Sequence, residues 1–299
     1  MQAFNPKTIA IYSVGLLGGS IAAALRRSGF DGKIIGLSSP ASLNTAEELD
    51  LIDEGYPYSE LQRVIAKTDL LMLCSPVLAI IKTIEALGKM DLPPGLVITD
   101  IGSTKKIITE AAQKYLPEST RFIGGHPMAG SEKSGPSSSD PYLFQNAVYV
   151  LTQTEAKHNE TACGLAEFLQ NFLGCRTVLM DPAKHDSIVA AISHLPHILA
   201  AALVLNAFQQ EKQTAGTLSL AAGGFRDMTR IASANYEIWH DIFVTNKDAV
   251  ISQIDSFLDT LTRMRASLVN DALKEDFEEA KRIKDAILNS NDFTDRERS

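Results

Sequence analysis

The chain contains few cysteines and no long apolar runs. Its 299 residues include three cysteines, Cys74, Cys163 and Cys175, and none stands in a C-x-x-C pair. Such usage is typical of a reduced compartment. No window reaches the ~18 apolar residues of a membrane span, and the richest stretch, Ile198 to Leu205, is interpreted as a buried helix. No secretory signal begins the chain, so a cytoplasmic protein without a membrane partner is predicted.

Basic residues are also outnumbered. The chain has 28 basic and 36 acidic residues, which gives a formal net charge of −8. A nucleic-acid-binding surface needs clustered positive charge, so this balance argues against a nucleic-acid partner. It does not exclude a small anionic substrate, because a few local arginine or histidine side chains can bind one on an acidic protein.

The pattern changes along the chain near Asp181-Pro182. Before it, short apolar runs that predict strands alternate with helical segments, which is typical of a parallel sheet covered on both faces. After it, segments with a 3.6-residue period dominate. The expected strands are 8–12, 33–37, 69–74, 96–101, 121–123 and 148–152, and the clearest later helices are 188–208, 236–246 and 248–268.

The predicted fold is therefore an α/β N-terminal Rossmann domain, residues 1–176, with a doubly wound, mainly parallel sheet. An all-α C-terminal domain, residues 177–299, follows it. Its helices, for example 188–205, are apolar on more than one face. Such surfaces need a cover, so we expect this domain to bind substrate and to dimerise, giving a homodimer.

A glycine-rich turn follows the first expected strand. Gly15 and Gly18 match the second and third glycines of G-x-G-x-x-G, whereas Ser13 takes the place of the first. In this motif the second glycine lets the backbone approach a pyrophosphate, and the third lets helix and strand pack closely. The context of strand, turn and small-faced helix favours dinucleotide binding over a plain tight turn. The predicted cofactor-binding residues are Gly15, Leu16, Leu17, Gly18, Ser38 and Ser75.

The ribose-reading position lies about 20 residues after the turn, where Ser38 stands. An acidic residue there would favour NAD, and a neighbouring arginine would favour NADP. Serine carries no charge to repel a 2′-phosphate, and no arginine is immediately beside it. The sequence thus leaves NAD and NADP both open as the cofactor.

Polar clusters interrupt the apolar pattern in both halves. Residues 100–105 and 124–135 each follow an expected strand, and ligands of such sheets bind outside the carboxyl ends of the strands. These clusters contain Ser103, which also suits a helix N-cap, and His126. The helical half carries His185-Asp186, residues 193–197 (SHLPH) and residues 223–232, which include Arg226 and Arg230.

The histidine pair His194 and His197 does not predict a metal site. The pair lacks the i,i+4 spacing and the glutamate of the zincin motif, and no thiol lies nearby in sequence. We therefore expect no metal. The arginines suggest a carboxylate receptor, because guanidinium binds carboxylates in a bidentate manner. For Arg226, a surface salt bridge is an equally good interpretation.

In combination, these segments resemble the prephenate/arogenate dehydrogenase family of tyrosine biosynthesis. The matching pieces run in family order over about residues 8 to 245: 15–20 (GLLGGS), 100–105 (DIGSTK), 126–130 (HPMAG), 185–186 (HD), 193–197 (SHLPH) and 225–230 (FRDMTR). The resemblance implies a Rossmann domain followed by a dimerising helical domain. It also implies oxidative decarboxylation of a cyclohexadienol, with hydride leaving ring carbon 4 for NAD or NADP.

The resemblance further implies roles for individual side chains. His126 would be the general base toward the C4 hydroxyl, and Ser103 would hold the same hydroxyl. Arg230 would bind a substrate carboxylate, and His197 would help place the side-chain carboxylate. The remaining positions that match the family's substrate site are His185, which with Asp186 would support the pocket, and Glu132 and Trp239, which would line it.

Two departures and two alternatives stay open. Ser13 and Ser38 replace residues common in dinucleotide sites, and nothing separates prephenate from arogenate as substrate. A β-hydroxyacid dehydrogenase shares the architecture, but it usually depends on a lysine in the helical half, whereas the expected chemistry here lies on His126. A non-catalytic dinucleotide-sensing module would keep the glycine turn without needing His126, His197 and Arg230.

Overall fold

The structure, a computed structural model, describes residues 4–131, 133–152 and 159–296. The chain divides into two compact units, residues 1–249 and 250–299. The larger unit holds the sheet and the first helices of the C-terminal half, and the smaller unit is helical.

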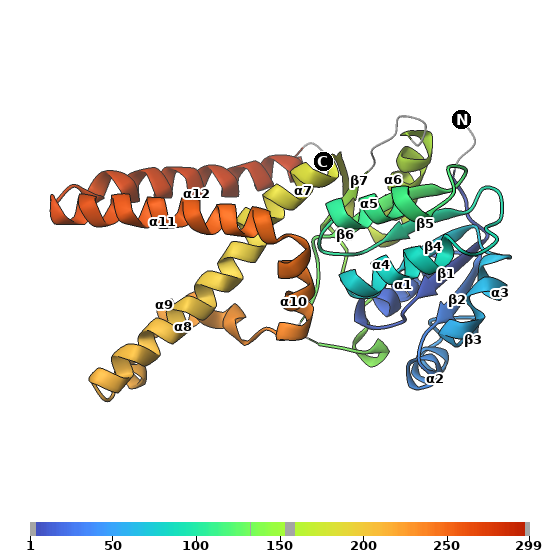
Figure 1. Ribbon diagram of the computed structural model, residues 1–299, viewed down its shortest axis with the longest axis horizontal. Helices are drawn as coiled ribbons and strands as arrows, with labels where there is room; N and C mark the ends of the chain where they lie inside the picture. The colour runs from blue at the N-terminus through green and yellow to red at the C-terminus, as the bar shows by residue number, and fades with distance from the viewer. Residues whose placement is uncertain (1–3, 132, 153–158, 297–299) are drawn as a thin grey trace. The chain divides into compact units, whose positions relative to one another are not determined.

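The sheet of the larger unit has the Rossmann strand order. Within the described residues it has eight strands in the order β3-β2-β1-β4-β5-β6-β7-β8 (Figure 1). All neighbouring pairs are parallel except β6 and β7. The first six strands follow the doubly wound order 3-2-1-4-5-6, so the predicted fold is confirmed. The strands are β1 (Thr8–Tyr12), β2 (Lys33–Leu37), β3 (Glu54–Tyr56), β4 (Leu70–Leu73), β5 (Val97–Asp100), β6 (Arg121–Pro127), β7 (Val148–Thr152) and β8 (Arg176–Met180).

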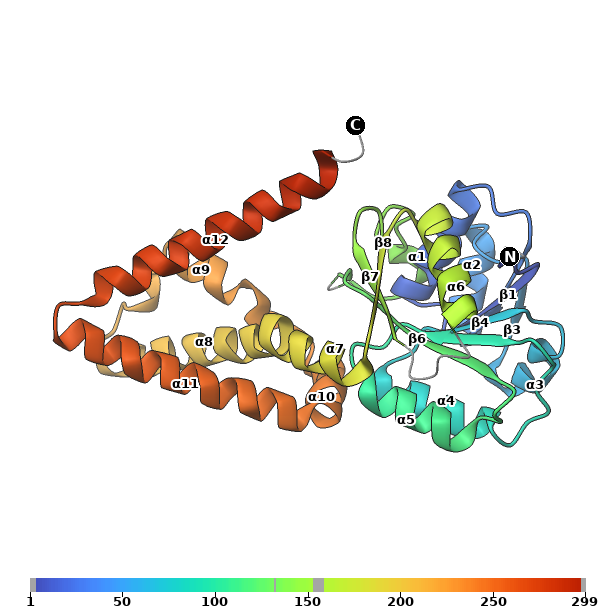
Figure 2. The ribbon, with the colours of Figure 1, turned by 90° about the horizontal axis from the view of Figure 1, so that it is seen from above.

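Helices cover both faces of this sheet (Figure 2). One layer consists of α1 (Leu16–Arg27), α2 (Pro40–Glu48) and α6 (Asn159–Leu173), and the other of α3 (Leu61–Ile65), α4 (Val77–Leu87) and α5 (Lys106–Tyr115). Successive residues of β1 enter opposite cores: Ile9 and Ile11 pack on the first layer and Ala10 on the second. Because both faces are buried, the central strands are apolar without alternation.

Three features of the sheet differ from the sequence prediction. The edge strands β3 and β8 were not predicted; β3 has only three residues, and Val178 and Leu179 of β8 are about 40% exposed, so neither gives a clear apolar run. β8 carries the sheet to Met180, beyond the division expected at residues 176 and 177. β6 extends past residue 123 and includes His126, which pairs with Val150 of β7.

A continuous helix opens the helical half. It comprises α7 (Pro182–Val189), a π-helical turn (Ala190–His194) and α8 (Leu195–Gln213). Pro196 has no N–H to donate to the preceding turn, and its ring crowds that turn, so the helix widens just before it. The larger unit then continues with α9 (Gly223–Thr229) and α10 (Tyr236–Thr245).

The apolar stretch of α8 is not buried in the single chain. Within 198–205 only Ala200 is fully buried, so the prediction of a buried helix was wrong. Among the described residues, the continuous helix 182–213 is also long and apolar enough, by length and composition, to cross a membrane, with 28% of its most apolar window buried. This finding corrects the expectation that no segment is long and apolar enough to span a membrane, although a core helix of a soluble protein passes the same test.

The smaller unit is formed by α11 (Lys247–Val269) from Val250 onward and by α12 (Leu273–Arg296). The chain reverses at Asp271, which has a positive φ of 56°. An ion pair between Arg263 and Asp276 joins the two helices beside this turn. Both helices expose large apolar side chains, among them Leu258, Leu261, Phe277 and Ile283.

Candidate active site

The glycine turn connects β1 to α1 with the geometry of a phosphate site. Gly15 is the N-cap of α1, and a Cβ built on it would meet no atom within 4 Å. A Cβ on Gly18 would lie 2.4 Å from the carbonyl oxygen of Ser13 and 2.9 Å from Ile11. One glycine therefore keeps space open at a helix N-terminus, where anions bind, and the other permits close helix–strand packing. Ser13 holds the positive φ, 78°, of the missing first glycine.

Two further cofactor-site candidates lie at the same edge of the sheet. Ser38 directly follows β2 and is buried, with its hydroxyl 3.5 Å from that of Tyr58. Ser75 is half-buried between β4 and α4. Because β1, β2 and β4 are parallel neighbours, their carboxyl ends bring the glycine turn, Ser38 and Ser75 to one edge. The residues therefore fit a dinucleotide laid across that edge.

A buried ion pair joins the ends of β5 and β6. The Lys105 ammonium binds the Asp100 carboxylate, and both side chains are fully buried. Lys105 Nζ also donates to the carbonyl oxygen of Gly125 at 2.7 Å, while the backbone N–H groups of Gly102 and Gly125 donate to Asp100. Burial lowers the pKa of Lys105, and the Asp100 charge opposes this shift. The pair holds β6 in place just before His126.

His126 is the first of three linked polar side chains. Its Nδ1 lies 2.9 Å from Nε2 of His185, and His185 Nδ1 lies 2.7 Å from Oδ1 of Asp186. The His126 ring is half-buried, whereas His185 and Asp186, both on α7, are 1% and 4% exposed. Burial, followed by the charges of His185 and Lys105, lowers the pKa of His126 well below its ordinary value. The ring is therefore neutral at neutral pH.

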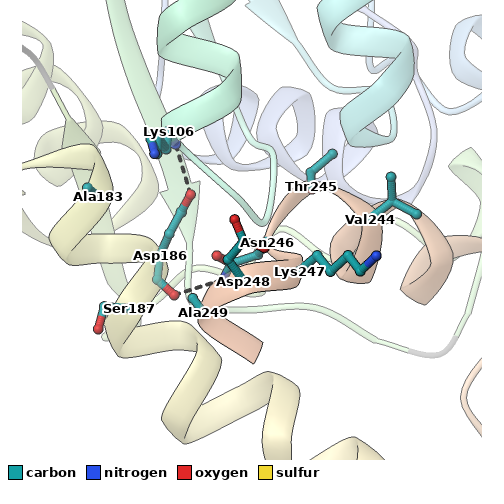
Figure 3. Close-up of a pocket in the computed structure, with 10 residues that line it drawn as sticks. All are labelled: Lys106, Ala183, Asp186, Ser187, Val244, Thr245, Asn246, Lys247, Asp248 and Ala249. Carbon is teal, nitrogen blue, oxygen red and sulfur yellow. Dashed lines mark hydrogen bonds between the residues drawn. The ribbon is translucent and has the colours of Figure 1, made fainter. Parts of the chain in front are cut away.

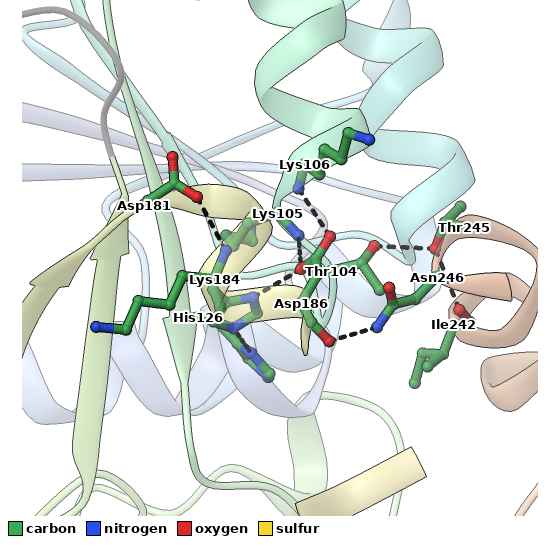
Figure 4. Close-up of polar contacts among 12 residues, drawn as sticks. Thr104, Lys105, Lys106, His126, Asp181, Lys184, Asp186, Ile242, Thr245 and Asn246 are labelled. Atoms are coloured by element: carbon green, nitrogen blue, oxygen red, sulfur yellow. Dashed lines mark hydrogen bonds and ion pairs between the residues drawn. The ribbon is translucent and has the colours of Figure 1, made fainter. Parts of the chain in front are cut away.

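Asp186 also caps a helix of the Rossmann part (Figure 4). The backbone N–H of Lys105 donates to Oδ1 at 2.7 Å, and that of Lys106 donates to Oδ2 at 2.9 Å, at the N-terminus of α5. Ser103 does not cap α5, so that interpretation of Ser103 was wrong: a carboxylate from α7 satisfies these donors instead. Asp241 of α10 accepts from Leu78 N–H at 3.1 Å and caps α4 in the same way.

Asn246 links Asp186 to the aromatic cluster of α8 and α10. Its Nδ2 donates to the carbonyl oxygen of Asp186 at 2.8 Å and lies 3.3 Å from Nδ1 of His194. His194 packs edge-on against Trp239, and the His197 ring lies flat on the same indole with centroids 3.6 Å apart. Burial lowers the pKa of His194 to about 4, so this histidine is an uncharged part of the packing.

Of the expected substrate-binding residues, His197 is the one that packs on Trp239 among the described contacts. His197 Nδ1 lies 3.0 Å from the Ser193 carbonyl oxygen, which leaves Nε2 available, and burial lowers the pKa of this histidine. The charge of Arg230, whose side chain is exposed, lowers this pKa further. Arg226 is exposed on α9. Glu132, the other expected lining residue, lies outside the described residues.

A cavity of about 390 Å³ lies beside this network (Figure 3). It is lined by Asp186 and by residues at the N-termini of α5 and α7 and around the turn from α10 to α11: Lys106, Ala183, Ser187, Val244, Thr245, Asn246, Lys247, Asp248 and Ala249. Neither His126 nor Ser103 lines it. The cavity is therefore next to the His126 network and is not the place where the expected chemistry meets.

Sequence reasoning did not find the contacts that connect these residues. His185-Asp186 stood out as a polar pair, but its partners His126, Lys105 and Lys106 are 59 to 81 residues away in the chain. Asn246 carried no signal at all, because it is one polar residue at the end of an amphipathic helix.

The fold and the site together define a dinucleotide-binding dehydrogenase with a Rossmann domain and a helical C-terminal half. Comparison with known proteins identifies the family. Residues 21–179 match the model of the prephenate dehydrogenase nucleotide-binding domain, and residues 181–283 match that of the prephenate dehydrogenase dimerization domain. The chain belongs to the prephenate dehydrogenase family, enzymes of tyrosine biosynthesis.

Individual relatives agree with this membership. A prephenate dehydrogenase of Lactococcus lactis is 35% identical over 94% of this chain and 77% of its own length. A cyclohexadienyl dehydrogenase of Zymomonas mobilis is 30% identical over 96% of this chain and 98% of its own length. The family membership decides against both the β-hydroxyacid dehydrogenase and the sensor alternatives.

Solved structures show the same architecture over nearly the whole chain. Prephenate dehydrogenase from Aquifex aeolicus in complex with hydroxyphenyl propionate and NAD+ superposes with a TM-score of 0.86, at 34% identity over 94% of this chain and 98% of that one. The arogenate dehydrogenase of Synechocystis superposes with a TM-score of 0.79, at 32% identity over 94% and 99% of the two chains.

Proposed function

We propose that this chain converts prephenate to 4-hydroxyphenylpyruvate by oxidative decarboxylation, with NAD+ as hydride acceptor. The observation that supports the proposal most directly is the position of His126. It is a neutral, half-buried imidazole at the end of β6, at the sheet edge that also carries the phosphate-binding turn. A base of this kind is suited to take a hydroxyl proton at neutral pH.

In this reaction the protein mainly has to orient the substrate and accept one proton. His126 Nε2 takes the proton of the C4 hydroxyl, and Ser103, at the neighbouring strand end, holds the same hydroxyl by a hydrogen bond. The C4 hydride leaves for the nicotinamide, which supplies the two-electron acceptor when bound. The ring carboxylate departs as CO2, its bonding electrons complete the aromatic ring, and the proton held by His126 returns to the C4 oxygen to give the phenol. Aromatisation makes the step downhill.

The substrate carboxylate is held from the helical half. Arg230 presents an exposed guanidinium that can form a bidentate pair with a carboxylate. His197 is fixed on the Trp239 face by stacking and by the Ser193 carbonyl, so Nε2 is directed for a second hydrogen bond. These contacts fit a substrate that carries both a ring carboxylate and a side-chain carboxylate.

The choice of NAD+ rests on the Aquifex aeolicus relative, which was solved with that cofactor. Ser38, the buried side chain after β2, carries no charge to repel a 2′-phosphate. We therefore expect NADP+ to be used as well, less efficiently. Prephenate is chosen over arogenate because the Lactococcus lactis relative, at 35% identity, carries that name.

A homodimer in the cytoplasm completes the proposal. The match to a dimerization domain covers residues 181–283, and α8 exposes Leu203, Val204, Leu205 and Phe208, which a second copy would cover. We place the division between the dinucleotide-binding part and the helical part after β8, at Met180. No nucleic-acid partner is included, because the chain is acidic overall.

The test is an absorbance assay at 340 nm with prephenate and arogenate, each with NAD+ and with NADP+. Turnover of prephenate with NAD+ is expected, and no turnover in any combination by a protein that binds the dinucleotide would refute the proposal. A His126→Ala variant should bind NAD+ normally and lose roughly 10²–10⁴-fold in kcat, the range of general acid–base catalysis. Unchanged turnover in that variant would exclude His126 as the base.

A further inference from the structure

Two buried residues behind His126, His185 and Asp186, have no place in the reaction described above. Asp186 Oδ1 accepts the Lys105 N–H, and Oδ2 accepts the Lys106 N–H. This carboxylate therefore acts as a hydrogen-bond acceptor toward the N-terminus of α5. His185, its neighbour on α7, is 1% exposed and has Nδ1 at 2.7 Å from the same Oδ1.

The hydrogen bonds of Asp186 determine which ring nitrogen of His185, and then of His126, carries the proton. Because Asp186 accepts, His185 Nδ1 must carry the proton and donate it. Neutral imidazole has one donor and one acceptor nitrogen, so His185 Nε2 is left as an acceptor. It lies 2.9 Å from His126 Nδ1, which must then carry the His126 proton. The His126 nitrogen left bare is Nε2.

We propose that His185 and Asp186 are positioning residues that fix His126 in the tautomer whose Nε2 is the free base. This inference rests on the proposed role of His126. A carboxylate that holds an imidazole in one tautomer is the relationship found in hydrolase triads; here a second imidazole stands between the carboxylate and the base. The ring planes, 70° apart with centroids at 5.1 Å, also fix the orientation of His126.

His185 and Asp186 also hold His126 in place when His126 takes the substrate proton. The imidazolium that forms keeps its Nδ1–H directed at His185 Nε2, and the Asp186 carboxylate beyond it favours the positive charge. Burial and the Lys105 charge still oppose the imidazolium, so the contribution of the chain is the fixed position of the Nδ1 proton. A solvent-exposed histidine would lose this fixed tautomer.

The tautomer is measured directly by NMR, without turnover. In protein labelled with 15N-histidine, ring-nitrogen shifts separate a protonated from a bare nitrogen, and the His126→Asn spectrum identifies the His126 signals among the six histidines. We expect protonated Nδ1 and bare Nε2 in the wild type, and a mixture of both tautomers in His185→Phe. A wild-type His126 with protonated Nε2 would overturn the proposal.

Turnover supplies the second measurement. In His185→Phe, kcat should fall roughly 10²-fold, the lower end of the range for a general base, with KM for NAD+ and prephenate changed by less than about threefold. His185→Gln should recover part of this loss, because its amide oxygen can accept the His126 Nδ1–H. A kcat in His185→Phe equal to that of the wild type would refute the positioning role.

Asp186→Asn needs a control, since Asp186 also caps α5. Asp241→Asn is matched, because Asp241 also caps a helix of the Rossmann part, α4, and its contacts within the described part of the chain do not include His126, His185 or Asp186. We expect Asp186→Asn to lower kcat and Asp241→Asn to leave it unchanged, at similar thermal stability. Equal losses in both variants would make capping the whole effect. If the wild type shows the expected tautomer but no turnover, the proposed function fails and the positioning chain stands.

Discussion

The two glycines of the phosphate turn should respond in opposite ways to the same substitution. In Gly18→Ala the new Cβ would lie 2.4 Å from the Ser13 carbonyl oxygen and 2.9 Å from Ile11 Cγ2. In Gly15→Ala it would meet nothing within 4 Å. The first change therefore affects the packing of α1 on β1, and the second affects only the space that a ligand would occupy.

The size of each effect follows from these contacts. Overpacking a core costs about 1–3 kcal/mol, and for Gly18→Ala we expect the upper end because the obstructing atom is backbone and cannot rotate away. A loss of about 3 kcal/mol corresponds to a Tm lower by about 6–12 °C in a domain of this size. Gly15→Ala should lose less than about 1 kcal/mol, the difference between glycine and alanine at an N-cap.

The assay is thermal unfolding followed by circular dichroism, with and without NAD+, together with calorimetric titration of NAD+. Bound cofactor stabilises the wild type by about 2.7 kcal/mol at 100 times its Kd. We expect Gly15→Ala to lose most of this increment, with NAD+ affinity at least about tenfold lower, equivalent to ~1.4 kcal/mol. Wild-type NAD+ affinity in Gly15→Ala, or a wild-type Tm in Gly18→Ala, would refute the reasoning.

Three further predictions concern charge. Lys105→Met should destabilise the protein by about 3–5 kcal/mol, because it leaves Asp100 buried without its cation. In urea unfolding, the double variant Lys105→Met with Asp100→Asn should recover part of this lost stability. A wild-type unfolding midpoint in the single variant would contradict the prediction. Burial lowers the pKa of His126 well below 6.5, so the neutral base persists to lower pH. The kcat/KM for prephenate should stay constant from pH 8 down to 6.5 and fall only below pH 6.5. A fall centred at pH 6.5 or above would exclude the lowered pKa of His126. Ser38→Asp should lower kcat/KM for NADP+ by about tenfold or more relative to NAD+, because a carboxylate would face the 2′-phosphate. An unchanged ratio of kcat/KM between NADP+ and NAD+ would show that Ser38 does not contact the ribose.

Much of the fold could be read from the sequence for a physical reason. Strands buried on both faces are apolar throughout, and this requirement is local, so β1, β2 and β7 were predicted with the bounds that the structure shows. The glycine turn could also be predicted from the sequence, because the close approach of α1 to β1 excludes any side chain at Gly18. Edge strands β3 and β8 lack that double burial, and their sequences accordingly gave no signal.

Other properties were decided by tertiary structure alone. The apolar face of α8 has the same pattern whether a core or a second subunit covers it, so the sequence could not distinguish burial from exposure. The sequence also placed His126 and His185-Asp186 in separate motifs, 59 residues apart. Only the packing of α7 against β6 and the N-terminus of α5 joins them, because hydrogen bonds between distant segments depend on where the backbone brings them. The sequence thus determined the residue types, and the fold determined the direction of each hydrogen bond between His126, His185 and Asp186.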